Sequence, residues 1–243
     1  MAVETITYQS GGKNFVGKLV YDDRVKTKRP LMLMAPNWCG VSQEAVERTQ
    51  KMVGSKYIGF VADMYGDGKT VGGPPEAACL ADGVRGDTAE RRRRIVAAFD
   101  TLIAEADKRG IGDLRRKATV GFCFGGGNVL ELARAGADVQ AVVCLHGDLI
   151  TPSPAKPGDI KAAVLIAHGS KDPVVPKKDR DAVEAELEAS GAKWQMLVFG
   201  GLLHSFCEPE SNVPGIGGYD AGAARQCFAM IDDFATAAFD KKL

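Results

Sequence analysis

A cysteine in a glycine-rich turn is the strongest chemical signal in the sequence. Gly121, Cys123 and Gly125 form a G-x-C-x-G string between the apolar run 117–122 and a helix-forming segment. Small residues flank a nucleophile at such a turn because the turn is sharp and the strand and helix backbones approach closely. The turn places the thiol at a helix N-terminus, where backbone N–H groups and the helix dipole favour a thiolate. The pattern predicts a cysteine nucleophile.

Two later polar residues complete a set of nucleophile, base and orienting acid. Asp172 follows an apolar run that ends at His168, and His204 lies in the loop after the run 194–199. A nucleophile needs a base, and the base needs a group that fixes its orientation. The chain order Cys123, Asp172, His204 is the order that the α/β-hydrolase fold requires. We predict that these three side chains form a catalytic triad.

The elements that must position these residues alternate between strands and helices. The segments 3–8 and 15–21 flank a glycine turn and predict an N-terminal β-hairpin. Later predicted strands are 31–35, 57–63, 117–122, 139–146, 161–168 and 194–199, and predicted helices are 42–56, 87–109, 126–135, 176–190 and 219–240. The alternation predicts an α/β fold with a mostly parallel central sheet and helices on both faces, in a single domain over residues 1–243. The segments 65–75, 151–159 and 200–218 are predicted loops.

The charge balance and composition exclude several classes of protein. The 243 residues include 31 Lys+Arg and 31 Asp+Glu, so the formal net charge is zero and no nucleic-acid partner is expected. No apolar run approaches the roughly 18 residues of a membrane span, and residues 1–5 lack the features of a signal peptide, so no membrane partner is expected. The six cysteines form no CxxC pair. We expect reduced thiols in a cytoplasmic protein that is a monomer or a homodimer.

The remaining histidines do not indicate a metal site. The three histidines of the chain have no HExxH or comparable spacing, and Gly125–Gly127 lacks the following lysine of a phosphate loop. We therefore expect no metal and no cofactor. His146 and His168 each end a predicted strand, and such histidines are more often hydrogen-bonded structural groups than ligands or bases.

The chain as a whole resembles the dienelactone hydrolase family. Three segments carry the resemblance: GFCFGG at 121–126, HGSKDP at 168–173 and GLLHSF at 201–206. The resemblance implies an α/β-hydrolase fold and a triad of Cys123, Asp172 and His204. It also implies an oxyanion hole made by the backbone amides of Phe124 and Trp38.

The sequence departs from the best-known members of this family at two positions. Where they carry a glutamate beside the nucleophile, this chain has Asn37, which cannot take up a thiol proton. Where they carry an arginine for the substrate carboxylate, this chain has Cys207 and Glu208, and a carboxylate there would repel an anionic substrate. The family's second arginine corresponds to Arg85 or to one of Arg91–Arg94. The predicted substrate-binding residues are Asn37, Cys39, Arg85, Cys207 and Glu208.

These features favour a hydrolase of small neutral esters or lactones that forms an acyl-thioester on Cys123. A neutral phosphotriester is a further predicted substrate, because its transition state also places charge on an oxygen. The alternative is a non-catalytic small-molecule binder or redox sensor on the same scaffold, which the loop cysteines Cys39, Cys123 and Cys207 motivate. An acyltransferase would share the triad and differ only in excluding water.

Overall fold

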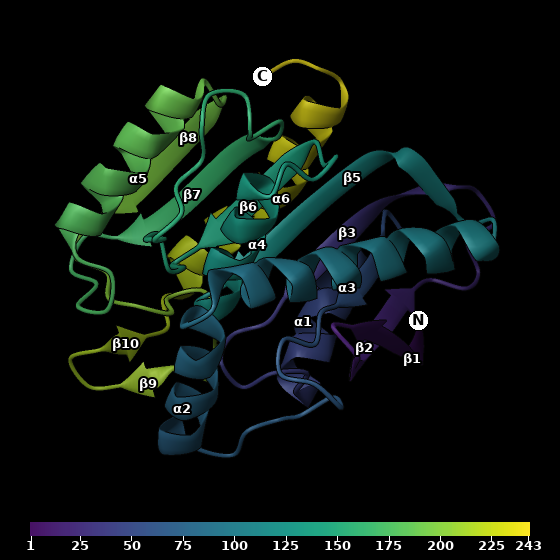
Figure 1. The fold of residues 1–243 in the computed structure, drawn as a ribbon, viewed down its shortest axis with the longest axis horizontal. Coiled ribbons are helices and arrows are strands. Elements are labelled where there is room, and N and C mark those ends of the chain that lie inside the picture. Colours follow the sequence, from purple (N-terminus) through teal and green to yellow (C-terminus); the bar gives the residue numbers. More distant parts are fainter. The chain divides into compact units, whose positions relative to one another are not determined.

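The structure, a computed structural model, describes residues 1–243 and divides into two compact units. Unit 1 covers Met1–Thr119 and unit 2 covers Val120–Leu243. Strand β5 (Gly112–Phe122) contains the boundary between them. The single domain over 1–243 stays a prediction. Figure 1 follows the chain from purple at the N-terminus to yellow at the C-terminus.

Unit 1 begins with the hairpin that the sequence predicts. Strands β1 (Ala2–Ser10) and β2 (Lys13–Tyr21) pair antiparallel across two glycines, and β2 pairs antiparallel with β4 (Ile58–Val61). Strand β4 pairs parallel with β3 (Arg29–Ala35). The strand order within this unit is β1-β2-β4-β3-β5 (Figure 1).

Three helices pack in unit 1, and local capping explains where two of them begin. The Ser42 side chain accepts from Ala45 N at the start of α1 (Gln43–Val53), and the Asp87 side chain accepts from Glu90 N at the start of α3 (Thr88–Lys108). Both caps satisfy backbone donors that the first helical turn leaves open. Helix α1 packs on β2 and β4, and α3 packs on β1, β3 and β4.

Helix α2 (Pro74–Arg85) corrects the sequence analysis, which predicts no helix there. The glycines and prolines of 65–75 predict a loop, and no element is predicted between this loop and the Asp87 cap. The helix begins at Pro74 itself, since proline is tolerated in the first turn, where its missing N–H has no helical partner. Helix α2 packs against α3.

Unit 2 contains the parallel part of the fold. Strands β6 (Ala141–Leu145), β7 (Ala163–Gly169) and β8 (Trp194–Phe199) pair parallel, and the order within the unit is β5-β6-β7-β8. Parallel strands buried on both faces are near-continuous apolar runs, as β6 and β7 are. With the antiparallel hairpin of unit 1, these pairings confirm the predicted α/β class and its mostly parallel strands.

Three helices and one short hairpin complete unit 2. Helices α4 (Phe124–Arg134) and α6 (Ala221–Phe239) both pack on β6, and Figure 1 shows α5 (Lys177–Ser190) alongside β7 and β8. The predicted loop 200–218 is wrong in part, because it contains the antiparallel strands β9 (Asn212–Val213) and β10 (Gly217–Gly218). Two-residue strands are too short to leave an alternating pattern in a sequence.

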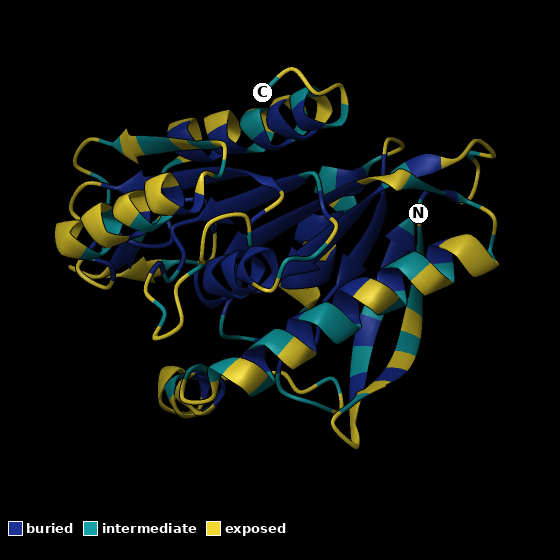
Figure 2. Cartoon of the chain, turned by 45° about the horizontal axis from the view of Figure 1, so that its top comes forward, coloured by how far each residue is buried: buried dark blue, intermediate teal, exposed yellow.

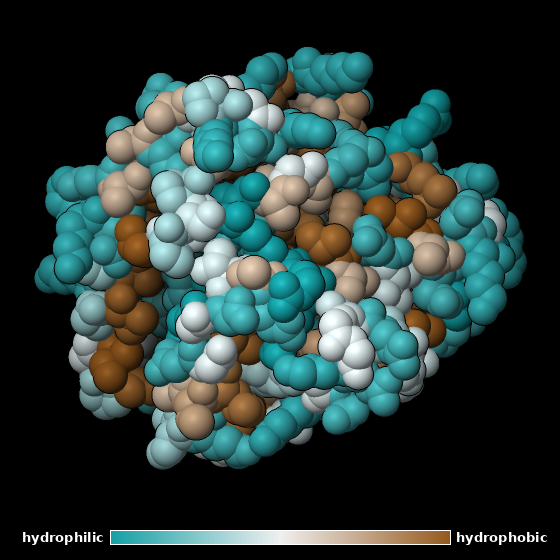
Figure 3. Space-filling model, viewed as in Figure 1, coloured by the Kyte–Doolittle hydropathy of each residue, from teal (hydrophilic) through white to brown (hydrophobic).

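Burial follows the strands in both units. Figure 2 shows the inner strands buried along most of their length and the helices exposed on their outer sides, whereas the edge strands β1 and β8 are partly exposed. Helix α4 is the exception, because all eleven of its residues are buried. Figure 3 shows mostly hydrophilic side chains on the face it presents, with apolar side chains in separate patches. None of the helices combines the length and apolar character that crossing a membrane requires.

Candidate active site

The Cys123 turn has the geometry that the G-x-C-x-G string predicts. Cys123 ends β5, is the N-cap of α4 and has a φ of 51°, which is rare for a residue with a side chain. A Cβ atom on Gly121 would lie 2.1 Å from the carbonyl oxygen of Gly125, so only glycine fits between strand and helix. A Cβ on Gly126 would lie 2.6 Å from the Cα of Gly147. The glycines thus permit the strained turn that presents the thiol.

The structure brings Cys123 and His204 together within unit 2. The Nε2 atom of His204 lies 3.1 Å from the Sγ atom of Cys123. Both side chains are nearly buried, with residue exposures of 8% for Cys123 and 6% for His204. At this distance one proton can be shared between the sulfur and the ring.

Asp172 holds the opposite nitrogen of the His204 ring. The Nδ1 atom of His204 lies 2.8 Å from the Oδ2 atom of Asp172. The other carboxylate oxygen, Oδ1, accepts hydrogen bonds from the backbone amides of Val174 at 2.8 Å and Val175 at 3.0 Å. The Nε2 atom of His168 lies 3.2 Å from Oδ2, an electrostatic contact that falls short of hydrogen-bond geometry. Asp172 is therefore fixed in orientation by contacts on both of its oxygens.

The electrostatics of the site favour a charged ring. Burial lowers the pKa of His204, but the negative charge of Cys123 and the hydrogen bonds with Asp172 and Cys123 outweigh it and raise the pKa from 6.5 to about 10. Burial likewise opposes ionisation of Asp172, yet the contacts with His168 and His204 bring its pKa well below the usual range. The arrangement fits an imidazolium that lies between the Asp172 carboxylate and the sulfur of Cys123.

The short hairpin that sequence reasoning missed fixes the backbone of His204. Its amide donates to Ile216 O at 3.0 Å, and its carbonyl accepts from Gly218 N at 3.1 Å. The following residue, Ser205, has a φ of 55°. The chain therefore turns sharply just after a histidine whose backbone is bonded to β10. A glycine-rich stretch at 215–218 is the only sequence signal for this arrangement.

His146 is a further residue at the site that the sequence analysis placed among structural histidines. Its Nδ1 atom accepts a hydrogen bond from the backbone N–H of Cys123 at 3.2 Å. Its ring centroid lies 5.5 Å from that of His204 and 5.2 Å from that of Phe206. All three histidines of the chain, His146, His168 and His204, therefore contact a member of the Cys123–His204–Asp172 cluster.

The two residues of the predicted oxyanion hole fall in different units. Phe124 is the first residue of α4 and is buried, so its amide belongs to the N-terminal turn of that helix. Trp38 follows β3 in unit 1, and its carbonyl accepts a hydrogen bond from the Tyr65 hydroxyl at 2.9 Å. That pairing holds the backbone at residue 38. The shared oxyanion hole stays a prediction.

The predicted substrate-binding residues differ in their surroundings. Asn37 lies in the same loop as Trp38, and its Oδ1 atom accepts from Cys39 N at 2.9 Å. Arg85 ends α2 and forms an ion pair with Asp82 at 2.9 Å. In unit 2, Cys207 and Glu208 are buried directly after the His204 turn. Their contact with a substrate stays a prediction.

Arg94, one of the alternatives to Arg85 as a substrate-binding arginine, is hydrogen-bonded to other groups of unit 1. Its guanidinium donates to Met64 O at 2.7 Å and to Glu90 at 2.9 Å. Arg91 is also buried. Neither side chain belongs to a freely solvated face of α3.

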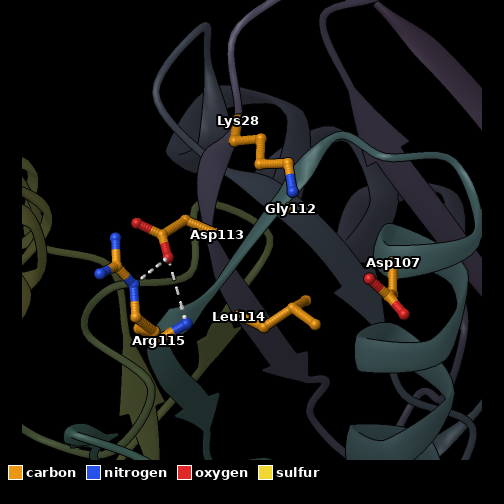
Figure 4. Close-up of a pocket in the computed structure, with 6 residues that line it drawn as sticks. All are labelled: Lys28, Asp107, Gly112, Asp113, Leu114 and Arg115. Atoms are coloured by element: carbon orange, nitrogen blue, oxygen red, sulfur yellow. Dashed lines mark hydrogen bonds and ion pairs between the residues drawn. The ribbon is translucent and has the colours of Figure 1, made fainter.

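A cavity in unit 1 has no comparable chemistry. It has a volume of about 410 Å³ and is lined by Lys28, Asp107, Gly112, Asp113, Leu114 and Arg115 (Figure 4). The Arg115 side chain points to Asp113, with its Nε atom 3.4 Å from Oδ1. The cavity lies at the amino end of β5, whereas ligands of parallel α/β sheets bind at the carboxyl ends. No group of three or more His, Cys, Asp or Glu is arranged to hold a metal ion.

The sequence and the fold both match those of a known protein family. The sequence model of the dienelactone hydrolase family matches residues 16–238. The fold matches the crystal structure of a dienelactone hydrolase-like promiscuous phosphotriesterase from metagenomic libraries, with a TM-score of 0.88, 31% identity and 98% of both chains covered. It also matches the structure of a protein named m3DLH, with a TM-score of 0.89, 32% identity and 98% of both chains covered.

A curated relative gives the same result at lower similarity. A protein of Escherichia coli (strain K12), provisionally named as a carboxymethylenebutenolidase, is 24% identical over 186 residues, which cover 73% of this chain and 67% of that protein. The matches confirm the α/β-hydrolase fold and a hydrolase activity that acts on small molecules. The chain belongs to the dienelactone hydrolase family.

Proposed function

We propose that the protein hydrolyses small neutral carboxylic esters or lactones through a Cys123–His204–Asp172 triad. The observation that carries this proposal is the 3.1 Å approach of His204 Nε2 to Cys123 Sγ, with Asp172 2.8 Å behind the ring. A raised pKa of about 10 for His204 supports an imidazolium that faces the sulfur of Cys123 at neutral pH. The thiolate is the nucleophilic form of cysteine.

In the first half-reaction the sulfur becomes acylated. The Cys123 thiolate attacks the carbonyl carbon, a C–S bond forms, and the carbonyl electron pair moves onto the oxygen. We assign stabilisation of this oxyanion to the amides of Phe124 and Trp38, each worth about 3 kcal/mol in comparable sites. When the intermediate collapses, the C–O bond of the ester breaks. The departing alkoxide takes the proton from His204 Nε2 and leaves as the alcohol, with a thioester on Cys123.

In the second half-reaction water releases the acid. His204, now neutral, accepts a proton from water at Nε2 while the water oxygen attacks the thioester carbonyl. Collapse of this intermediate breaks the C–S bond, releases the carboxylic acid and restores the thiolate beside the imidazolium. Asp172 keeps the Nδ1–H of His204 in place throughout, so that Nε2 always faces the sulfur.

Two of the predicted substrate-binding residues, Glu208 and Asn37, support a neutral substrate. Glu208 is buried four positions after His204, where a carboxylate disfavours an anionic ligand. Asn37 supplies an amide, and its oxygen is already bonded to the backbone of Cys39. The substrate class therefore excludes ligands that require an arginine clamp at these positions.

The proposal is tested by a pre-steady-state burst with p-nitrophenyl esters and lactones. Wild-type protein is expected to release p-nitrophenol in a burst, and mass spectrometry of quenched samples is expected to locate the acyl group on Cys123. Cys123→Ala removes both signals. Cys79→Ala, which alters an exposed cysteine on α2, is the matched control and retains both. Full esterase activity in Cys123→Ala would refute the triad.

A second candidate activity is hydrolysis of neutral phosphotriesters. It is supported by the similarity to the metagenomic phosphotriesterase, which is 31% identical over nearly the whole chain. The thiolate would attack phosphorus and expel an aryloxide, after which water would cleave the S–P bond. Paraoxon turnover that disappears in both Cys123→Ala and His204→Gln is the expected result. Turnover that survives either substitution would separate this activity from the triad.

A further inference from the structure

His146 contacts two residues of the proposed triad, the backbone N–H of Cys123 and the ring of His204. His146 follows β6 and is fully buried, and its Nδ1 atom accepts from the backbone N–H of Cys123 at 3.2 Å. Its ring is edge-on to the ring of His204, with centroids 5.5 Å apart and planes at 70°. No step of the proposed hydrolysis uses the His146 side chain. Its position between the backbone of Cys123 and the ring of His204 indicates that it has a role.

The backbone of His146 is strained, which indicates that its surroundings hold it in place. Its φ is 39°, a value that residues with a side chain rarely adopt. Such strain persists only where the neighbouring structure over-determines it, and it concentrates at functional sites. Here Phe122 and Phe206 pack against the ring, with centroids 6.1 Å and 5.2 Å away. The next residue, Gly147, lies against the backbone of α4 at Gly126.

The hydrogen bond from Cys123 fixes the tautomer of His146. A ring nitrogen that accepts an N–H bond carries no proton, so the ring is neutral with its proton on Nε2. A neutral ring also avoids like-charge repulsion with the adjacent His204 imidazolium. Because the Nδ1 lone pair is occupied by the backbone of the nucleophile, His146 is suited to positioning and not to proton transfer.

We propose that His146 is a positioning residue that locks the Cys123 turn through its Nδ1 acceptor and so keeps Sγ aligned with His204. The same Cys123 N–H also reaches Leu145 O at 3.1 Å, so the turn keeps one backbone bond when the imidazole is lost. Loss of the acceptor is therefore expected to misalign the thiol without unfolding the chain. The proposal rests on the hydrolase function proposed above.

Three substitutions of His146 distinguish the effect of its Nδ1 acceptor from the effects of its aromatic ring and of its strained backbone. His146→Asn provides an amide oxygen near the position of Nδ1, and asparagine tolerates positive φ. His146→Gly also tolerates positive φ but has no acceptor, so it forms a matched pair with His146→Asn. His146→Phe keeps an aromatic ring without an acceptor.

We expect kcat of ester hydrolysis to depend on a hydrogen-bond acceptor at position 146. In ester hydrolysis, kcat of the Gly and Phe variants falls about 10- to 100-fold with KM within about twofold, which is the cost of a small misplacement of a reacting group. The Asn variant stays within about threefold of wild type. Thermal midpoints are measured for all variants, because a merely structural role would make kcat follow stability. Equal kcat in the Asn and Gly variants would overturn the proposal, whether or not the Phe variant folds.

A second readout needs no substrate. Iodoacetamide alkylates Cys123 by forming an S–C bond and releasing iodide, and the rate reports thiolate alignment and availability. Rates are read by mass spectrometry against the exposed Cys79 in the same molecule. The order wild type, Asn, then Gly and Phe is expected, and an unchanged rate in the Gly variant would contradict the proposal. If wild type hydrolyses no ester, the proposed function fails, and these alkylation rates still decide the role of His146.

Discussion

Two buried carboxylates, Asp63 in unit 1 and Asp172 in unit 2, each follow a buried strand, and they differ in their hydrogen-bond partners. Asp63 is fully buried, and its oxygens accept four backbone N–H bonds of 2.8 to 2.9 Å, from Val16, Tyr65, Gly66 and Gly68. Asp172 accepts only two backbone amides, both on Oδ1, and directs Oδ2 at His204. A carboxylate bonded wholly by backbone organises a loop. A carboxylate with one oxygen directed at an imidazole is suited to orienting that ring as a base.

The largest expected effect on kcat is that of replacing Asp172. Asp172→Asn is expected to lower kcat for p-nitrophenyl esters by about 10³- to 10⁴-fold, because the amide no longer holds the His204 tautomer that faces the sulfur. The fold should persist, since an amide oxygen can still accept from Val174 and Val175. Stopped-flow kinetics and a thermal melt measure the two quantities.

The matched control for this substitution is Asp181→Asn on α5. Asp181 pairs with Lys177 on the protein surface, so the same chemical change should leave kcat unaltered. A loss of less than about tenfold in Asp172→Asn would place the orienting role elsewhere.

Replacing Asp63 should have the opposite effect, a large loss of stability with a small change in the rate of hydrolysis. Asp63→Ala leaves four backbone donors without their acceptor and is expected to lower the free energy of unfolding by roughly 3 kcal/mol or more. Urea denaturation measures this loss. Activity per folded molecule, assayed at low temperature, should stay within about threefold of wild type. A variant of normal stability that had lost its activity would give Asp63 a catalytic task and remove the contrast.

The pH dependence of hydrolysis distinguishes the two carboxylates further. The folded pKa of His204 is raised from 6.5 to about 10, so the imidazolium contributes fully to stability below pH 6.5, and this contribution is lost as pH rises through about 10. Because the same proton serves the leaving group, we expect kcat/KM to fall about tenfold per pH unit above that value.

Rates measured from pH 6 to 11 test this expectation in three proteins. Asp172→Asn removes two of the causes that raise the pKa of His204, so the residual activity should decline at a lower pH than in wild type. Asp63→Ala should decline at the same pH as wild type. A wild-type profile that is flat beyond pH 10.5 would contradict the imidazolium assignment.

The sequence predicts the parts of the fold that carry strong local patterns. Strand 194–199 is observed as Trp194–Phe199, and the predicted helix 176–190 is observed as Lys177–Ser190. The Cys123 turn follows from its glycines, because no other residue fits at position 121. These inferences succeed because local sequence determines local geometry there. The rule that sites form at the carboxyl ends of strands points to Asp172 and His204, and the structure places both side chains beside each other, while their catalytic role stays a prediction.

The features that sequence reasoning missed depend on contacts between distant residues. Strand β5 begins at Gly112, five residues before the predicted start, because the exposed Arg115 and Arg116 interrupt its apolar pattern. The contacts of His146 arise from a φ of 39° that no neighbouring residue type predicts. The four amides that meet on Asp63 include Val16 from β2, 47 positions away. Only the folded chain shows that Asp172 directs an oxygen at His204, whereas Asp63 is bonded by backbone amides.

The smallest predicted effect concerns the loop that Asp63 organises. Gly68 donates its N–H to Asp63 Oδ2 at 2.8 Å and has a φ of 67°, and a Cβ there would lie 3.1 Å from the Cβ of Val16. Gly68→Ala is therefore expected to lower the free energy of unfolding by about 1 to 2 kcal/mol through backbone strain. Urea denaturation checks the value.

Gly83→Ala in helix α2 is the control, because its Cβ would enter open space and its φ lies outside the positive range. Replacing a helical glycine should stabilise the protein by up to about 1 kcal/mol. Both variants should hydrolyse esters at the wild-type rate, since each changes a residue of unit 1, whereas Cys123 and His204 belong to unit 2. If Gly68→Ala instead lowered kcat tenfold at unchanged stability, the Asp63 loop would take part in the reaction, and the division between a loop-organising and a base-orienting carboxylate would have to be abandoned.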